Sequence, residues 1–367
     1  MKHLVLLGGG HAHVHTLANL DRFRRAGCRV SVVQPSPFHY YSGMGPGLLS
    51  RMYSPAEIRF ATQDRVEKQG GSFVCDTAVR IDPRSRTIVL LSGHTMNYDI
   101  LSCNVGSYVP DELVPAQAKD VYTVKPIDTL LRFRERIEDK MSRARTSVAV
   151  IGGGPAALET TANLQRLVHD VARHPTRITL FAGRKFMSRF SSTARTKAYQ
   201  ALIRQGVQIN ESGYVQEVDT NRVVLETGET WAPDISLLAL GVRPSSIFSA
   251  SNMTTGPDGG LPVNASLQNV HHPEIFGGGD CISYCPRPLD KVGVYAVRQN
   301  PVLYSNLMAM AQGGRLRPFR PQKRYMLLFN TGDGQGILVR GNLAFRGKWV
   351  FGLKDHIDRK FIHRFGP

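Results

Sequence analysis

The sequence predicts an α/β protein in which one parallel-sheet domain is inserted into another, followed by a short α/β segment. A strand–glycine turn–helix–strand pattern occupies residues 4 to 34, and the same pattern returns at residues 147 to 181. An apolar strand that ends in Gly-Gly-Asp follows later, at residues 275 to 280. Repeated strand–helix–strand units favour parallel sheets covered by helices, so the order of these three motifs predicts two such domains.

The first motif has the residues that a dinucleotide needs from its binding loop. The apolar run from Leu4 to Leu7 predicts a buried strand, and glycines follow it directly. Glycine allows the tight turn and lets the backbone approach a pyrophosphate, which the next helix N-terminus stabilises. We therefore expect a bound dinucleotide, with its ribose at the end of the second strand. The expected contacts are Gly8, Gly10, His11, Ala12 and Gln34.

Two positions in this motif depart from the usual pattern. His13 stands where Gly or Ala is expected, and Gln34 stands where an acid would bind the ribose more strongly. His11, His13 and His15 alternate through the turn, where they cannot converge on one ion without distorting the loop. No metal site is therefore expected.

The second motif matches the pattern better, because Ala157 is an allowed small third residue. Its ribose position falls near Ala182, with no acid, and Arg184 and Lys185 follow. Basic residues there could hold the 2′-phosphate of NADPH. NADPH and NADH both remain open, and so does a site that has lost its nucleotide. The expected contacts are Gly152, Gly154, Pro155, Ala156 and Arg184.

Beyond these motifs, the chain resembles a known protein family in six segments: 6–13, 41–47, 98–101, 124–127, 293–299 and 353–359. They resemble the pyridine nucleotide-disulfide oxidoreductase superfamily, in its branch of type II NADH dehydrogenases. They are most similar to the flavoprotein domain found alone or fused ahead of selenide, water dikinase. The resemblance covers nearly the whole chain and implies two Rossmann-like domains in a glutathione-reductase-like fold. The expected divisions are an FAD-binding domain (1–115 and 246–320), an NAD(P)-binding domain (116–245) and a C-terminal segment (321–367).

The resemblance implies an enzyme, an FAD-dependent NAD(P)H oxidoreductase that passes hydride to flavin and then electrons to a quinone-like acceptor. Glu159 is similar to a glutamate that lies near nicotinamide and flavin, which makes it the candidate catalytic residue. A helix predicted from about residue 292 to 310 would present its N-terminus to the flavin. The remaining cofactor-binding candidates are Ser42, Gly43, Val79, Gly106, Lys125, Gly279, Asp280, Gly293, Val294 and Tyr295.

Several departures keep two other interpretations open. Val294 and Arg298 stand where type II dehydrogenases have two glutamines, and residues 38 to 58 lack the redox cysteines of disulfide reductases. Cys281 and Cys285 form a C-x3-C pair, so a sulfide- or selenium-linked flavoprotein is one alternative. A flavin-binding interaction protein with a degenerate nicotinamide site is the other.

The net charge of +17 predicts an anionic partner. From Arg315 onward there are twelve Lys and Arg residues against three acids, and no nucleic-acid motif accompanies them, so nucleic acid is not expected. Residues 349–365 predict an amphipathic basic helix with the apolar stripe Leu353, Ile357, Phe361 and Phe365. That stripe predicts either an anchor on an anionic membrane surface or packing on the protein or a second subunit in a homodimer. The expected location is the cytoplasm, with attachment to the inner face of a membrane as the alternative.

Overall fold

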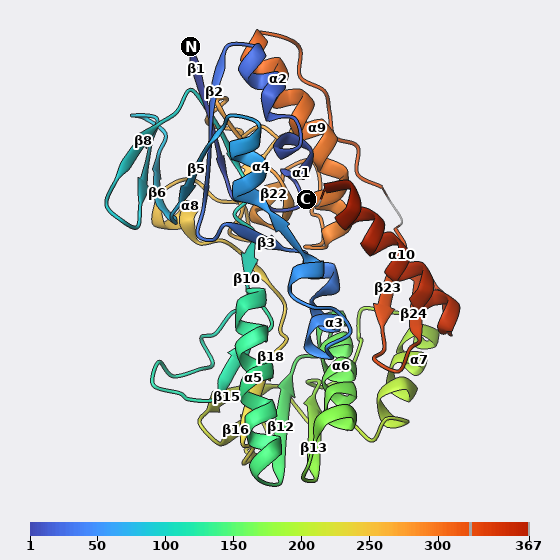
Figure 1. Cartoon of the computed structure of the whole chain (residues 1–367). Coiled ribbons are helices and arrows are strands. Elements are labelled where there is room, and N and C mark those ends of the chain that lie inside the picture. Colours follow the sequence, from blue (N-terminus) through green and yellow to red (C-terminus); the bar gives the residue numbers. More distant parts are fainter. Residues whose placement is uncertain (323–324, 366–367) are drawn as a thin grey trace.

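In the computed structural model, which describes residues 1–322 and 325–365, two five-stranded parallel sheets lie one above the other (Figure 1). The upper sheet has the order β21 (Ile275–Gly277), β9 (Ile100–Cys103), β1 (Lys2–Leu7), β2 (Cys28–Gln34) and β5 (Ser72–Cys75). The lower sheet has the order β11 (Val121–Thr123), β18 (Ile235–Leu238), β12 (Thr146–Ile151), β13 (Thr176–Phe181) and β14 (Gln208–Asn210). Every lower strand falls between β9 and β21 in the chain, so the lower domain is inserted into the upper one. The predicted fold class is confirmed.

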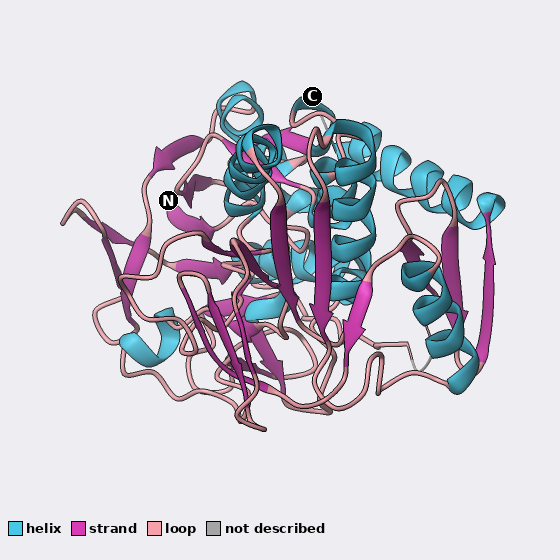
Figure 2. Ribbon diagram, turned by 90° about the horizontal axis from the view of Figure 1, so that it is seen from below, coloured by secondary structure: helices cyan, strands magenta, loops and turns pink. Residues whose placement is uncertain are grey.

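Helices cover both sheets. In the lower domain, α5 (Ile127–Arg143), α6 (Pro155–Val171) and α7 (Ser192–Ile203) accompany the strands, as Figure 2 shows from below. In the upper domain, α4 (Thr62–Lys68) and the long α9 (Gly293–Gln312) pack on the sheet, while α3 (Gly45–Leu49) and α8 (Ile247–Ala250) are short. Leu4 to Leu7 of β1 are almost entirely buried, as a strand between helix layers requires.

The helix expected after the first glycine turn is divided into α1 (Val14–Leu17) and α2 (Leu20–Arg25). Asn19 lies at the break, and its side chain donates to the carbonyl of His15 at 2.8 Å. An asparagine side chain that bonds the backbone competes with the helical hydrogen bonds, which accounts for the interruption.

Small antiparallel sheets complete each domain. The upper domain has β6 (Ala78–Asp82), β7 (Thr87–Leu90) and β8 (Thr95–Asn97), with the pairs β3 (Phe38–Tyr40)–β4 (Arg59–Ala61) and β20 (Leu261–Val263)–β22 (Ile282–Tyr284). The lower domain has β15 (Val215–Asp219), β16 (Arg222–Leu225) and β17 (Thr230–Trp231). The two chain crossings between the domains pair with each other, β10 (Ser107–Tyr108) with β19 (Arg243–Pro244).

The C-terminal segment is a β-meander followed by a helix: β23 (Leu327–Asn330), β24 (Gly336–Arg340), β25 (Leu343–Gly347) and α10 (Lys348–Phe365). The expected helix is present, but the expected packing of its apolar stripe is only partly right. Phe365 is buried, whereas Ile357 is exposed, and Lys354 and Asp358 are buried instead. The difference has a physical cause, because these two polar side chains pair with each other and with Gly43 and Tyr41 of the upper domain. No described helix is long and apolar enough to cross a membrane.

Candidate active site

A cavity of about 450 Å³ opens beside the first glycine turn, and we call it the fingerprint cavity. It lies at the carboxyl ends of β1, β2 and β9, where open parallel sheets bind their ligands. Ten of the residues predicted to bind cofactor line it: Gly8, Gly10, His11, Gln34, Ser42, Gly106, Lys125, Gly279, Asp280 and Gly293. Residues from several distant parts of the sequence thus meet around one cavity.

Gly8 makes the turn that leads into this cavity. Its φ is +83°, a conformation that favours glycine, and a Cβ there would collide with the backbone oxygen of Asn104. His13 occupies the position where the pattern normally has a small residue. Its ring is fully buried, with Nδ1 2.6 Å from the Gly8 oxygen and Nε2 2.7 Å from Ser102 Oγ. The histidine therefore ties the turn to β9, and the departure from the pattern has a structural role.

Two amide side chains hold the glycine turn in place. Gln34 accepts from the Gly9 N–H at 2.9 Å and donates to the carbonyls of Ser36 and Phe38, so its amide is occupied by the protein. Asn104, which sequence reasoning missed, accepts from the Ala12 N–H at 3.2 Å and donates to the Gly278 carbonyl at 2.7 Å. It links the first glycine motif to the third. Its position directly after β9 was the signal that could have identified it.

A charged triad lies in the wall of the fingerprint cavity. Lys125 contacts Asp280 at 3.1 Å, and Ser107 donates to the same carboxylate oxygen at 2.8 Å. Burial favours the neutral acid, but the Lys125 charge and these hydrogen bonds outweigh it and hold the pKa of Asp280 below its usual value. Asp280 is therefore an ionised acceptor for a ligand hydroxyl group.

Two histidines beside this triad are neutral. Burial is the main cause that lowers the pKa of His11 to about 4 and that of His39 to about 3. The charge of Lys125 acts in the same direction on both, whereas Asp280 opposes the shift of His11. Both line the fingerprint cavity, and their rings lie edge to face at 5.8 Å. His39 Nε2 is buried, with no hydrogen-bond partner among the described residues. A buried nitrogen without a hydrogen bond costs free energy, and a polar atom of a ligand can supply the missing bond.

The second glycine turn precedes α6 in the lower domain. Gly152 has φ +148°, and a Cβ there would collide with the backbone oxygen of Ala239. Gly154 is the N-cap of α6 and Pro155 is its first residue, so the free backbone N–H groups of the helix start here, next to Ala156. This arrangement suits a pyrophosphate.

Arg184, predicted near the second ribose, already has a carboxylate partner. Its Nε and Nη2 donate to the two oxygens of Glu226 at 2.8 and 3.0 Å, and its guanidinium lies over the ring of Tyr214. Glu226 also accepts from the Tyr214 N–H at 3.0 Å. Sequence reasoning missed Glu226, because it comes from β16 and the following turn, far from the glycine motif in sequence.

Glu159 of α6 lies at the junction of both domains with the C-terminal segment. It accepts from the Asn330 N–H at 2.7 Å. Burial raises its pKa to about 7, although the charge of Lys354 and the Asn330 hydrogen bond oppose the shift. The carboxyl group can therefore both hold and release a proton near neutral pH.

Lys354 of α10 connects this glutamate to the loop before α3. It donates to the Gly43 carbonyl and to Asp358, both at 2.7 Å, and Tyr41 donates to Asp358 at 2.9 Å. Burial alone would lower the pKa of Lys354, but the charges of Glu159 and Asp358 outweigh it and raise the pKa above its usual value. A buried network of one cation and two acids thus spans all three parts of the protein.

The remaining predicted residues lie near the cavity without lining it. Ala12 and Gly43 belong to the loops described above, and the backbone of each makes a hydrogen bond to the protein. The exposed Val79 follows Ala78, which does line the fingerprint cavity. Val294 and Tyr295 are in the first turn of α9. Their roles in binding remain predictions.

Cys281 and Cys285 do not form a reactive pair in the structure. Cys281 is fully buried, with its sulfur 3.4 Å from the backbone oxygens of Cys103 and Gly278, and burial raises its pKa to about 11. Cys285 is exposed and free. A buried thiol with a high pKa is a poor nucleophile, which argues against Cys281 as a reactive thiol in the sulfur- or selenium-linked alternative.

The comparisons with known proteins agree with this geometry. The chain is 23% identical to a type II NADH:quinone oxidoreductase of Staphylococcus epidermidis (strain ATCC 35984), over 100% of this chain and 96% of the relative. Its fold is similar to the NDH2 of Plasmodium falciparum in complex with NADH (TM-score 0.79, 15% identity, covering 100% and 99%). It is also similar to the sulfide:quinone oxidoreductase of Aquifex aeolicus (TM-score 0.79, 14% identity, covering 100% and 91%). The model of the pyridine nucleotide-disulphide oxidoreductase family matches residues 2–312, and the chain therefore belongs to that family of oxidoreductases.

Proposed function

We propose that this oxidoreductase binds FAD in the fingerprint cavity, takes hydride from NADH bound at the second glycine turn, and delivers electrons to a quinone-like acceptor. The observation that carries the proposal is the fingerprint cavity itself, where the first glycine motif meets the Asp280–Lys125–Ser107 triad. A type II NADH:quinone oxidoreductase aligned with the whole chain supports the same reaction.

The residues present fit FAD. The Gly8 turn leaves no room for a side chain, so backbone N–H groups can approach a pyrophosphate. Asp280 suits a ribityl hydroxyl, and the orphaned His39 Nε2 suits a further polar atom of the cofactor. FAD, when bound, supplies the two-electron redox chemistry, while these side chains bind and orient it.

Among the nicotinamide nucleotides, the structure favours NADH. Arg184 would attract the 2′-phosphate of NADPH, but Glu226 already accepts from its Nε and Nη2 and places a negative charge beside the guanidinium. The ribose of NADH carries no such charge. Glu226 is therefore expected to weaken the binding of NADPH relative to that of NADH.

An anaerobic absorbance titration with NADH and NADPH in parallel tests both proposals. NADH is expected to bleach the flavin band near roughly 450 nm at lower concentration than NADPH. In the Glu226→Gln variant, the ratio of the NADPH to the NADH concentration needed for half-maximal bleaching should fall by about tenfold, as expected for one charge-assisted contact. Glu229→Gln, which removes a nearby exposed acid, is the matched control. A flavin spectrum that neither nucleotide changes would refute the dehydrogenase proposal and favour the flavin-binding interaction protein.

Glu159 is proposed to handle a proton beside the nicotinamide and flavin, with Lys354 as its charged neighbour. The support is the raised pKa of Glu159, about 7, and the Lys354 bond to Gly43 in the loop expected beside the flavin. The pH dependence of the Glu159→Gln variant tests this role.

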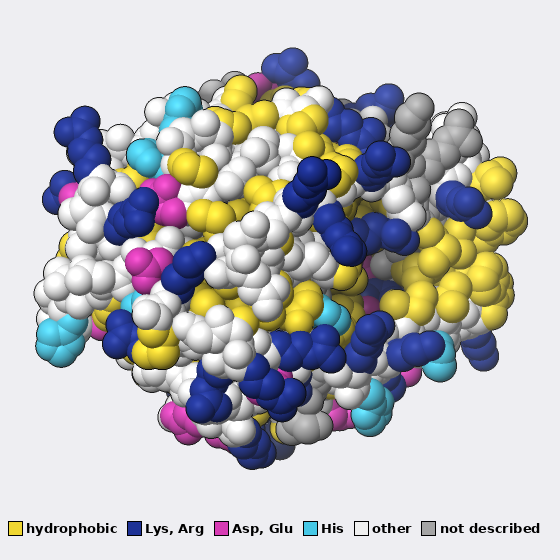
Figure 3. All heavy atoms as spheres, turned by 90° about the horizontal axis from the view of Figure 1, so that it is seen from above, with side chains coloured by type: hydrophobic (Ala, Val, Ile, Leu, Met, Phe, Trp, Pro, Cys, Tyr) yellow, Lys and Arg dark blue, Asp and Glu magenta, His cyan; other side chains and the backbone are white. Residues whose placement is uncertain are grey.

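We also propose that the outer flank of the C-terminal segment binds an anionic membrane surface. Leu343, Phe345, Trp349 and Ile357 are exposed there, with Trp349 58% accessible. Figure 3 shows hydrophobic side chains gathered at the right-hand edge, the side on which α10 lies in Figure 1, with Lys and Arg beside them. The exposed bases on α10 include Lys348, Lys360 and Arg364. An apolar patch rimmed by cations suits anionic lipid head groups.

Co-sedimentation with phosphatidylglycerol vesicles tests the membrane proposal. The protein is expected to bind, and Trp349→Glu should weaken binding at least tenfold because it places an acid in the apolar patch. Leu91→Glu, at an exposed apolar position on the upper domain, is the control and should bind like the native protein. If Trp349→Glu changes only the oligomeric state, the patch is a dimer interface instead.

A further inference from the structure

An arginine and a tyrosine, Arg184 and Tyr214, lie one over the other beside the second glycine turn, and we call the pair the ring platform. The central carbon of the Arg184 guanidinium is 5.6 Å from the centroid of the Tyr214 ring. The segment that carries Arg184 packs on the glycine turn, because a Cβ on Gly153 would lie 2.6 Å from the Ala182 oxygen and the Met187 N–H donates to the Gly153 carbonyl at 2.7 Å. The ring platform therefore adjoins the place where a nucleotide pyrophosphate is expected.

The backbone before Arg184 makes room for the tyrosine. Gly183 has φ +70°, a conformation that favours glycine, and it pairs with Gly213 in an isolated antiparallel bridge. A Cβ at Gly183 would lie 2.7 Å from a carbon of the Tyr214 ring. A side chain at this position would displace the ring, so the glycine allows Tyr214 to lie against the end of the segment that follows β13.

Glu226 fixes both members of the ring platform. It accepts from Nε and Nη2 of Arg184 at 2.8 and 3.0 Å, which holds the guanidinium in one orientation. It also accepts from the Tyr214 N–H at 3.0 Å, and its own N–H donates to the Tyr214 carbonyl at 2.8 Å. The Arg184 side chain remains 70% exposed. One face of the guanidinium lies over the tyrosine, and this exposure leaves the opposite face open to a ligand.

The adenosine half of a nucleotide needs such a contact in this protein. Ala182 stands at the ribose position, and its methyl group cannot accept a hydrogen bond from a ribose hydroxyl. An acid there would supply a charge-assisted hydrogen bond. Guanidinium planes and aromatic rings both stack on the flat face of a nucleobase. Stacking at Arg184 can therefore replace part of the binding that the missing acid would give.

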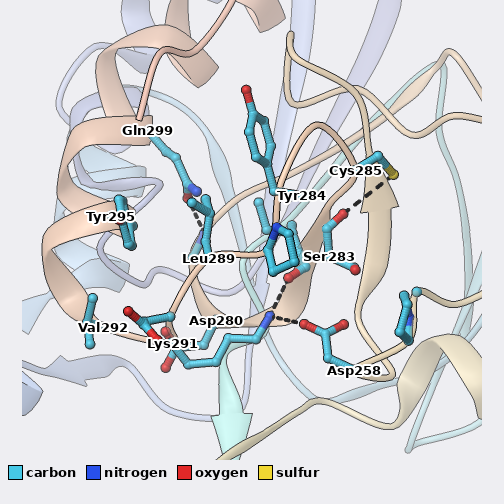
Figure 4. A pocket seen from close by; sticks show the side chains of 16 residues that line it. Asp258, Asp280, Ser283, Tyr284, Cys285, Leu289, Lys291, Val292, Tyr295 and Gln299 are labelled. Carbon is cyan, nitrogen blue, oxygen red and sulfur yellow. Dashed lines mark hydrogen bonds and ion pairs between the residues drawn. The ribbon is translucent and has the colours of Figure 1, made fainter. Parts of the chain in front are cut away.

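A cavity of about 330 Å³ in the upper domain also has aromatic walls (Figure 4). Its lining residues fall between 256 and 299, whereas the expected adenosine position is at the end of β13 in the lower domain. Its lysine is already paired, because Lys291 contacts Asp258 at 2.7 Å and donates to the Ile282 carbonyl. This cavity does not suit an adenine whose pyrophosphate lies at the second glycine turn.

We propose that the ring platform binds the adenine ring of the nicotinamide nucleotide, which stacks on the open face of the Arg184 guanidinium; this rests on the proposed function. Tyr214 supports the guanidinium from the other side, and Glu226 keeps its plane fixed. The adenine contributes binding and takes no part in electron transfer. A stacked base carries no information about the ribose 2′ position, so discrimination between NADH and NADPH stays with Glu226.

Calorimetric titration with ADP-ribose tests this assignment in the full-length, flavin-loaded protein. ADP-ribose has the adenosine and pyrophosphate of the nucleotide but no nicotinamide, so its binding needs no redox step. Arg184→Lys keeps the positive charge and removes the plane. Tyr214→Leu removes the supporting ring, and Tyr214→Phe keeps it. Arg222→Lys is the matched control, because Arg222 of β16 is an exposed arginine that pairs with Glu217 in the same small sheet.

Both Arg184→Lys and Tyr214→Leu are expected to weaken ADP-ribose binding by about fivefold to tenfold, the loss expected for one stacked base. Tyr214→Phe and Arg222→Lys should bind like the native protein. In stopped-flow reduction of the flavin, the same factor should appear in the NADH concentration for the half-maximal rate and not in the limiting rate, because the adenine does not react.

The outcomes separate this proposal from the proposed function. Equal ADP-ribose affinity in the native protein, Arg184→Lys and Tyr214→Leu would overturn the stacking, even if NADH bleaches the flavin. A loss in Tyr214→Phe as large as that in Tyr214→Leu would also overturn it, because the ring would then not be the support. If NADH leaves the native flavin unchanged while ADP-ribose binding shows the expected losses, the proposed function fails and the adenine assignment stands.

Discussion

Replacing Lys354 by methionine is expected to lower the free energy of unfolding by about 3–5 kcal/mol, the usual effect of removing one partner from a buried ion pair. The Lys354 side chain is 11% exposed and that of Asp358 is 8% exposed, so water cannot replace the lost charge. Asp358 would keep one hydrogen bond, from Tyr41, and the Gly43 carbonyl would lose its donor. Urea unfolding followed by tryptophan fluorescence measures the change.

Two further variants show whether the unpaired acid causes this loss. Lys360→Met removes an exposed lysine from the same helix and should change stability by less than about 0.5 kcal/mol. The double variant Lys354→Met/Asp358→Asn removes the buried negative charge as well and should recover much of the loss. If the double variant is no more stable than Lys354→Met, the lysine stabilises α10 by packing alone.

Local spacing predicted the parts of the site that depend on the backbone. The glycines of both turns and the Gly-Asp after β21 directly follow strands, so a local pattern could locate them, although the backbone atoms that exclude a side chain at Gly8 and Gly152 belong to Asn104 and Ala239. The inserted arrangement followed from their order. Gly8 and Asp280 line one cavity, and their contacts with a cofactor remain predictions.

The side-chain partners could not be predicted in the same way, because they come from distant segments. Ser102 holds His13 from another strand, and Glu226 neutralises Arg184 from 42 residues away. Periodicity on α10 identified its apolar side chains but not which flank faces the protein. Tyr41 and Gly43 of the upper domain turn the Lys354–Asp358 flank inward, and no feature within residues 349–365 records that.

The Glu159→Gln variant is expected to be more stable than the native protein in neutral and alkaline solution but not in acid. Glu159 has its pKa raised from 4.5 to about 7, chiefly by burial. Below pH 4.5 the carboxyl is protonated in both the folded and unfolded chains, and glutamine, which can still accept from Asn330, should be equivalent. Between pH 4.5 and 7 the unfolded chain releases the proton more readily than the folded one, so the native protein loses stability as pH rises. At 1.36 kcal/mol per pH unit the difference reaches about 3 kcal/mol above pH 7.

The same variant separates a structural role of Glu159 from a chemical one. If Glu159 handles a proton beside the nicotinamide, the rate of flavin reduction by NADH in the native protein should change around pH 7, and the variant should lose that change. Unfolding curves at pH 4.5, 6 and 8 and stopped-flow rates over the same range give both readouts from one pair of proteins. A stability difference that grows with pH, together with identical rate profiles, would restrict Glu159 to a buried acid at the junction with the C-terminal segment. A stability difference that stays constant with pH would contradict the raised pKa itself, because only a carboxyl that titrates differently in the folded and unfolded chains makes the difference depend on pH.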